Sequence, residues 1–227
     1  MIYINIHTHK PSNSSNTLEI RNLFHTQISL PEKKPGNFFS IGIHPWHTKG
    51  IDLEKEISTL KKTARLENII AIGECGIDKV EGAALDEQTI IFKAQALIAE
   101  ELKKPMIIHC VKAYQEMISI RQVMNPSVPW IIHGFNKNEQ TARQLIKAGF
   151  FLSFGTSLFG ISNLSRLFTS LPNDTLFLET DEESGSKLKF LYEFAAKTKN
   201  ISTGEFNEII KYNFKQSFKI NANDWIK

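Results

Sequence analysis

Two histidines separated by one residue, His7 and His9, directly follow the apolar run 2–6 at the start of the chain. Such a run is typical of a buried strand, and a strand that ends in two imidazoles can supply half of a metal site. Alternate residues of a strand normally face opposite sides, so both histidines can bind one ion only where the strand is ending. The pair makes a metal-dependent hydrolase the first hypothesis.

The same arrangement, an apolar run followed by a possible ligand, recurs along the chain. The later cases are Glu74 after 69–73, His109 after 106–108, His133 after 130–132, and Glu179 with Asp181 after 176–178. Short continuous apolar runs favour strands covered on both faces, as in a parallel sheet with helices outside. We therefore expect these side chains at the C-terminal ends of strands, the edge where α/β barrels and open α/β sheets build their active sites.

Each of these residues also has a plain structural interpretation. A single histidine is more often a surface or hydrogen-bonded buried residue than a ligand, and we interpret His25 and His47 in that way. Glu74 and Asp181 would be costly buried charges unless they are paired or bound to an ion. The recurrence at several strand ends favours metal ligands over this interpretation.

Length and composition limit the possible architectures. The 227 residues, 41% of them hydrophobic and 22% charged, suffice for one domain over residues 1–227. This is short for an eight-stranded α/β barrel, typically roughly 250 residues, so loops or an outer element must be trimmed. The formal charge of +3 is compatible with an anionic substrate but is far from that of a protein that coats nucleic acid.

The sequence also bears on location. It holds no apolar run near the roughly 20 residues that a membrane span needs. The N-terminus reads as a core strand rather than a cleaved secretion signal, and Cys75 and Cys110 read as reduced packing residues. We expect a cytoplasmic protein without a membrane segment, and we infer no obligate protein partner.

Strand and helix patterns alternate along the chain. Strands are predicted at 2–6, 38–43, 69–74, 106–109, 130–133, 150–154 and 176–181, with a weaker eighth candidate at 27–30. Helices are predicted at 53–64, about 87–103, 140–147, 163–171 and 187–197, and after Ser202, which with Glu205 forms a capping-box pattern. The alternation indicates an α/β protein, and a closed (β/α)8 TIM barrel is the economical arrangement.

At this point the residues resemble a known family, the TatD-like metal-dependent deoxyribonucleases. The resemblance runs over nearly the whole chain and rests on the order and spacing of several short motifs: 7–9, 42–45, 73–78, 104–110, 133–135, 152–155 and 178–181. Gln88, Phe92 and Gln95 also match the helix motif that the family has between the glutamate, here Glu74, and the next histidine, here His109. Each motif alone is weak, but their combination is specific. The resemblance implies a (β/α)8 barrel, and the chain looks like a compact branch of the family.

The resemblance also implies a site with two divalent ions. One would be held by His7, His9, Glu74 and Asp181, and the other by Glu74, His109 and His133, with Glu74 bridging. A bridging carboxylate can hold two cations roughly 3.5 to 4 Å apart across a phosphate, which agrees with this assignment. The identity of the ions stays open between Mg²⁺, Mn²⁺ and Zn²⁺.

Further roles follow from the same comparison. Glu74 and Asp181 are the expected catalytic residues, with Asp181 orienting the attacking water or taking its proton. His44 is expected to contact substrate or phosphate, or else to donate a hydrogen bond behind the ligands. Lys112 is expected to contact substrate, and Asp78 is expected to be a supporting residue rather than a ligand.

The chain departs from the family pattern at three places. Asn5 stands where an aspartate is common, which removes a charge close to the ligands. Val111 and Lys112 stand where many members have an arginine, so a point charge replaces a bidentate phosphate grip. Residues 182–185 replace the usual Ser-Pro and bring two acidic residues, which would repel a polyanion unless they point away.

Three functions fit these features. The first is a metal-dependent phosphodiesterase, a hydrolase of ester bonds that trims the ends of DNA. The second is a metal-dependent hydrolase of small esters or amides on the same barrel, which Glu74 in the bridging role makes the weaker choice. The third is a binding protein that kept the fold without the activity, and the presence of all the inferred ligands argues against it.

Overall fold

The computed structural model describes residues 1–12, 14–26 and 37–222 of the chain. Eight strands form one parallel sheet in the order in which they occur along the chain. They are β1 (Tyr3–Thr8), β2 (Thr17–Phe24), β3 (Asn37–Gly42), β4 (Ile69–Asp78), β5 (Met106–Val111), β6 (Trp130–Ile132), β7 (Phe150–Phe154) and β8 (Leu176–Leu178). The predicted (β/α)8 barrel is therefore confirmed.

The barrel closes where the first and last strands meet. Thr8 forms a parallel bridge with Asp181, just beyond β8. The amide of His9 donates to the carbonyl oxygen of Asp181 at 3.0 Å, and the amide of Asp181 donates to the carbonyl oxygen of His7 at 3.1 Å. These bonds place the two ends of the sheet, and the residues that follow them, side by side.

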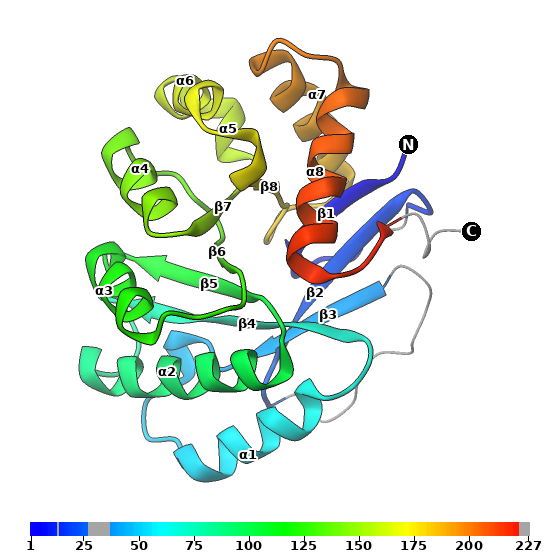
Figure 1. Cartoon of the computed structure of the whole chain (residues 1–227). Helices are drawn as coiled ribbons and strands as arrows, with labels where there is room; N and C mark the ends of the chain where they lie inside the picture. The colour runs from blue at the N-terminus through cyan, green and yellow to red at the C-terminus, as the bar shows by residue number, and fades with distance from the viewer. Residues whose placement is uncertain (13, 27–36, 223–227) are drawn as a thin grey trace.

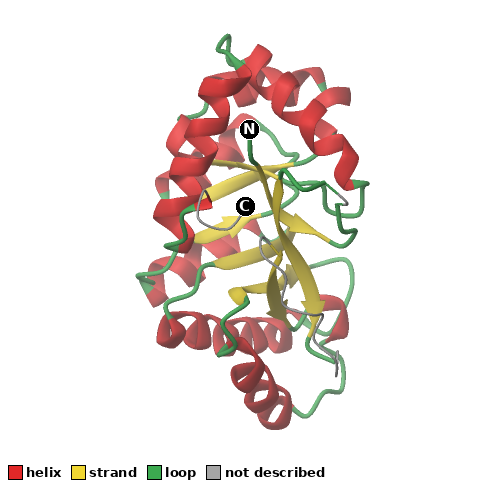
Figure 2. Cartoon of the chain, turned by 90° about the vertical axis from the view of Figure 1, so that its right-hand side faces the viewer, coloured by secondary structure: helices red, strands yellow, loops and turns green. Residues whose placement is uncertain are grey.

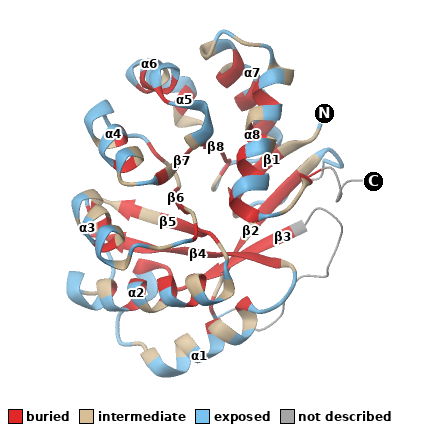
Figure 3. Ribbon diagram, in the orientation of Figure 1, coloured by how far each residue is buried: buried red, intermediate tan, exposed pale blue. Residues whose placement is uncertain are grey.

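Helices lie along much of the outside of the sheet, though the described residues place none over β2 (Figures 1 and 2). They are α1 (Leu53–Ala64), α2 (Leu85–Leu102), α3 (Tyr114–Met124), α4 (Glu139–Lys147), α5 (Ser157–Gly160), α6 (Ser162–Ser170), α7 (Leu188–Thr198) and α8 (Thr203–Phe218), with single 3₁₀ turns at Pro45–His47, Asn173–Thr175 and Gly185–Lys187. Their buried sides pack on the strands, and their outer sides are exposed (Figure 3). The predicted capping box of Ser202 and Glu205 forms, and Asp52 caps α1 by accepting from the amide of Lys55.

The shortening of the chain falls in the first part of the barrel. The described residues between β1 and β2 contain no helix, so β1 leads into β2 through a short loop. The lack of a helix in this connection accounts for part of the difference in length between this 227-residue chain and a typical α/β barrel.

Two features of the first half differ from the prediction. The candidate strand at 27–30 lies outside the described residues, and the second strand is β2, at Thr17–Phe24. Strand β4 does not end at Glu74 but continues to Asp78, paired with β5 as far as Val111. Gly76 permits this close pairing, because a Cβ atom there would overlap the carbonyl oxygen of His109. Glu74 therefore projects from within a strand.

Candidate metal centre

The residues predicted to bind metal gather at the C-terminal mouth of the barrel. They come from β1 and its end (His7, His9), from β4 (Glu74), from β5 (His109) and from the residues after β6 and β8 (His133, Asp181). They lie in or beside a cavity of about 520 Å³ whose lining includes all of them except His7, which is fully buried behind it. Glu74 is 4% exposed and lies at the centre of the group.

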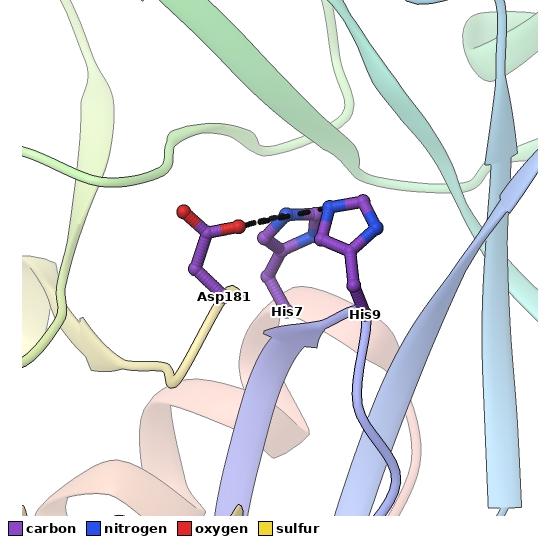
Figure 4. Close-up of side chains that lie close together, drawn as sticks. All are labelled: His7, His9 and Asp181. Carbon is purple, nitrogen blue, oxygen red and sulfur yellow. Dashed lines mark ion pairs between the residues drawn. The ribbon is translucent and has the colours of Figure 1, made fainter. Parts of the chain in front are cut away.

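The oxygen Oε2 of Glu74 faces His7, His9 and Asp181, a set that we call the Oε2 site. The Nε2 atoms of His7 and His9 both lie 3.4 Å from Oε2, and they lie 3.5 and 3.6 Å from Oδ1 of Asp181. Figure 4 shows the three side chains pointing toward one another. Four ligand atoms at about 2.1 Å from a tetrahedral ion would be about 3.4 Å apart. The four separations agree with that spacing, and His7, His9 and Asp181 lie close enough together to hold one ion.

A second observation supports this fit. Both ring nitrogens of the buried His7 lack a hydrogen-bond partner among the described residues. A buried polar atom without a partner is costly, and a cation at the Oε2 site would satisfy Nε2. The backbone of Asp181 adopts a left-handed conformation, with φ of 50°, in the turn from which its carboxylate enters the cavity.

The other oxygen of Glu74, Oε1, faces three imidazoles, a set that we call the Oε1 site. His44 Nε2 lies 3.0 Å from Oε1, His109 Nδ1 lies at 2.9 Å and His133 Nε2 lies at 2.8 Å. These are hydrogen-bond distances, shorter than the separations at the Oε2 site. By their ligand-atom spacing, His44 groups with Glu74 and His109 as possible ligands of one cation, whereas His133 groups with Glu74 and His7.

Burial and charge act against each other in this cluster. Burial raises the pKa of Glu74, but the coulombic effect of His133 and the hydrogen bonds with His109, His133 and His44 outweigh it and hold the pKa well below its usual range. Burial lowers the pKa of His7, yet the contacts with Asp181 and Glu74 raise it to about 9. Without a cation, the anionic Glu74 therefore lies beside a protonated His7, and a cation would replace that proton.

Acidic side chains behind the ligands hold two imidazoles in place. Oδ2 of Asp78 lies 3.1 Å from Nε2 of His109, as expected of a supporting residue. Oε1 of Glu179 lies 3.4 Å from Nδ1 of His133 and accepts the amide of Gly134 at 2.6 Å. Such carboxylates fix the orientation of a metal-binding imidazole and raise its basicity. From the sequence, Glu179 was expected only at a strand end, with no role assigned.

Two asparagines hold the backbone around the site. Oδ1 of Asn22, on β2, accepts the amide of Glu74 at 2.5 Å. Asn5, on β1, donates from its Nδ2 atom to Oγ1 of Thr180 at 2.8 Å and accepts the amide of Thr180 at 3.0 Å. A neutral amide can both donate and accept, so at this position Asn5 connects β1 to the segment that carries Asp181.

The other residues considered from the sequence lie partly in the cavity and partly outside it. Lys112 directly follows β5 and is exposed, and it lies outside the residues that line the cavity. Of the two acidic residues after Asp181, Glu182 lines the cavity, whereas Glu183 pairs with Lys187 at 2.7 Å. His25 is buried near Glu56, and His47 is exposed on the cavity wall. Cys75 and Cys110 are free and buried.

The barrel and its carboxylate-centred histidine cluster define a metal-dependent hydrolase of the α/β-barrel class. The sequence pattern of the family described as TatD related DNase matches residues 12–219, and the chain belongs to that family. Within the described residues, none of the helices has both the length and the apolar character that crossing a bilayer requires.

Individual relatives agree with this assignment. The chain is 29% identical over 201 residues to the uncharacterised metal-dependent hydrolase YabD of Bacillus subtilis, covering 81% of this chain and 78% of YabD. It is 32% identical over 162 residues to the 3'-5' ssDNA/RNA exonuclease TatD of Erwinia billingiae, covering 67% of this chain and 60% of that protein. The crystal structure of the TatD homologue YJJV of Escherichia coli superposes with a TM-score of 0.81 at 14% identity, over 96% of this chain and 98% of YJJV, and so shares the fold.

Proposed function

We propose that this protein is a phosphodiesterase that removes nucleotides from the ends of nucleic acid with two divalent cations at one site. The observation that carries the proposal is the position of Glu74, whose two carboxylate oxygens face separate ligand sets. A single carboxylate in this position is suited to bridge two cations across a phosphate. The exonuclease activity named for the Erwinia billingiae relative supports the choice of substrate.

The residues at the site would act as metal ligands and, in the case of Asp181, also as a base. His7, His9 and Asp181 would hold one cation with Glu74, and His109 and His133 would hold the other. Bound divalent cations lower the pKa of water, so that it attacks near neutral pH, and offset the negative charge that develops on phosphate. The Asp181 side chain is 41% exposed and reaches the cavity, where its free oxygen can orient the water and accept its proton.

The Asp181 carboxylate has the charge that this role needs. Burial raises the pKa of Asp181, but the hydrogen bond and charge of His7 and the charge of His133 lower it below the usual value. The group is therefore ionised at neutral pH and available as a base.

The shape of the site also suits the end of a nucleic-acid strand, because a barrel mouth admits a terminus more easily than the middle of a duplex.

A second candidate is a hydrolase of small esters or amides. It is favoured by the lining of the cavity, which includes Glu182 and, among the described residues, neither Lys nor Arg. A cavity without a lysine or arginine side chain gives a long polyanion little electrostatic attraction. The two candidates share the metal centre and differ in what enters the mouth.

One assay separates the candidates. The purified protein, supplied in turn with Mg²⁺, Mn²⁺ or Zn²⁺, is offered a labelled single strand, a duplex, and a panel of small phosphodiesters, esters and amides. We expect stepwise release of mononucleotides from one end, reduced by about 10³-fold or more in Glu74→Ala, since that variant loses the groups that stabilise charge in the transition state.

Glu183→Gln is the matched control, because this exposed acid pairs with Lys187 outside the cavity and should leave the rate unchanged. Turnover of esters or amides without nucleotide release would establish the second candidate. Absence of any turnover, with metal bound in stoichiometric amount, would refute both.

A further inference from the structure

Aromatic rings also line the cavity. Phe24 lies at the end of β2, and Trp46 and His47 lie in the 3₁₀ turn Pro45–His47 that follows β3. The Trp46 side chain is large and apolar yet 49% exposed, while its neighbour Pro45 is buried. We call these three residues, Phe24, Trp46 and His47, the aromatic wall.

The indole of Trp46 is fixed in position rather than free to turn. Its Nε1 atom donates to Oδ2 of Asp78 at 2.8 Å, and its backbone amide donates to Nδ1 of His44 at 3.2 Å. The buried Thr48 closes the same turn by donating from Oγ1 to the carbonyl oxygen of Pro45 at 2.6 Å. Because the ring is already ordered, a partner that stacks on it loses little further conformational entropy.

Trp46 also lies directly beside the metal centre. Its ring centroid is 4.9 Å from that of His44 and 5.9 Å from that of His109, and both of these imidazoles contact Oε1 of Glu74. Oδ2 of Asp78 contacts both Trp46 Nε1 and His109 Nε2. A flat group attached to a phosphate that the proposed cations hold beside Glu74 would therefore lie against the aromatic wall.

From this arrangement we propose that Trp46 is a specificity residue that stacks on the base next to the scissile phosphate. The inference rests on the proposed phosphodiesterase function and names the substrate feature that the site recognises, the face of an unpaired nucleobase. Stacking on an aromatic ring tolerates any base, because every base has a π face, and it needs no cationic side chain. Stacking would therefore supply affinity for nucleic acid in a cavity whose described lining residues include no lysine or arginine.

The first test is binding in the absence of catalysis. Adenosine is titrated into the metal-free protein in EDTA, and tryptophan fluorescence is recorded for the wild type and for Trp46→Phe. We expect saturable quenching in the wild type and none in Trp46→Phe, which keeps the buried Trp130 and also Trp225. No quenching in the wild type, or equal quenching in both proteins, would overturn the proposal.

The second test uses cleavage. Single strands carry either a base or an abasic sugar at the terminal position, at each end in turn, and kcat/KM is measured for both. We expect the wild type to prefer the base by about tenfold or more, the scale of base stacking on an aromatic ring. Trp46→Leu should bring the ratio close to one, and Trp46→Phe should restore much of it.

The control variant is Phe159→Leu, which changes another exposed aromatic residue, on α5 and packed on Phe194 away from the cavity. Its ratio should equal that of the wild type. A ratio in Trp46→Leu equal to that of the wild type would contradict the proposal. If the wild type cleaves no nucleic acid at all, the proposed function fails, and the adenosine titration still decides whether Trp46 binds a base.

Discussion

The two oxygens of Glu74 face ligand sets of different character. At the Oε2 site the donor atoms stand 3.4 to 3.6 Å apart and include a second carboxylate, Asp181. At the Oε1 site three imidazoles lie 2.8 to 3.0 Å from one oxygen, in hydrogen-bond contact. The first set is already spaced for a cation, whereas the second must break hydrogen bonds and move apart to take one.

The contrast predicts an order of binding. A cation at the Oε2 site gains two carboxylates and satisfies the unpartnered Nε2 of His7. A cation at the Oε1 site has only the shared Glu74 carboxylate and arrives beside a site that is already positive. We therefore expect the Oε2 site to bind tightly and first, and the Oε1 site to bind weakly and second.

Removing one ligand from each set gives the largest effect. His9→Asn should lose the ion that the wild type retains through dialysis, whereas His109→Asn should retain it and lose only the second ion. In each case the affinity should fall by more than the 10 to 100-fold that loss of a supporting residue costs. Elemental analysis after dialysis, followed by calorimetric titration, measures both ions. Loss of the retained ion in His109→Asn alone would reverse the proposed order.

A smaller effect is expected behind the Oε1 site. Glu179→Gln keeps an acceptor for the amide of Gly134 but removes the charge that faces His133. We expect the second ion to bind about 10 to 100-fold more weakly and the first ion to be little affected. Titration of the second ion measures this, with Glu183→Gln as the control. Equal weakening of both ions would show that the two sites are not separable.

Acidification should weaken both sites. The pKa of His7 is about 9, because its contacts with Asp181 and Glu74 outweigh the opposing burial, so at pH 7 the ring carries a proton that a cation must displace. Burial opposes protonation of His133 too, but the charges of Glu74 and Glu179 raise its pKa well above the usual value.

For each proton displaced, affinity should rise about tenfold per pH unit from pH 6.5 toward pH 9 and should level off above the pKa of the group. Calorimetry in two buffers of different protonation enthalpy counts the protons released on binding. A pH-independent affinity at the Oε2 site, with a dependence at the Oε1 site alone, would contradict the assignment of His7.

The smallest effect concerns the support of Asp181. Asn5→Ala removes both buried hydrogen bonds between its side chain and Thr180 and leaves the Thr180 amide only its longer bond, 3.3 Å, to the carbonyl oxygen of His7, which should lower the free energy of unfolding by about 1 to 3 kcal/mol. Urea denaturation measures this change. Val123→Ala, at an 82% exposed position on α3, should change it by less than about 0.5 kcal/mol. A stability equal to that of the wild type would show that Asn5 does not hold the segment of Asp181.

Much of this architecture could be predicted from the sequence, because continuous apolar runs such as 69–72 and 106–108 are short and rich in β-branched residues, which favours buried parallel strands. Strand β2 could not, because polar residues interrupt its apolar pattern. Glu19 is buried there, but it pairs with Arg21, and Asn22 turns inward to accept the amide of Glu74. The contact of Asn22 depends on a residue 52 positions away, and no local pattern reveals it. Helix α3 was likewise not predicted.

The candidate site, too, could be predicted only in part from the sequence. The ligand types and their order were visible because they follow apolar runs. The position of Glu74 inside β4 was not visible, because the continuation of that strand to Asp78 depends on its pairing with β5. The aromatic wall was also missed, since Phe24 and Trp46 are isolated in the sequence and approach the metal centre only through the fold. The motif 178–181 already contained Glu179, and its position on the strand was the one signal for its supporting role.

The bridge between Thr8 and Asp181 joins segments that are 173 residues apart in the sequence, next to the Oε2 site. During synthesis Asp181 emerges from the ribosome long after His7 and His9. A chain that has not yet reached Asp181 consequently lacks a carboxylate that the tighter cation requires. The Oε2 site can therefore form only when β1 and the segment after β8 have come together.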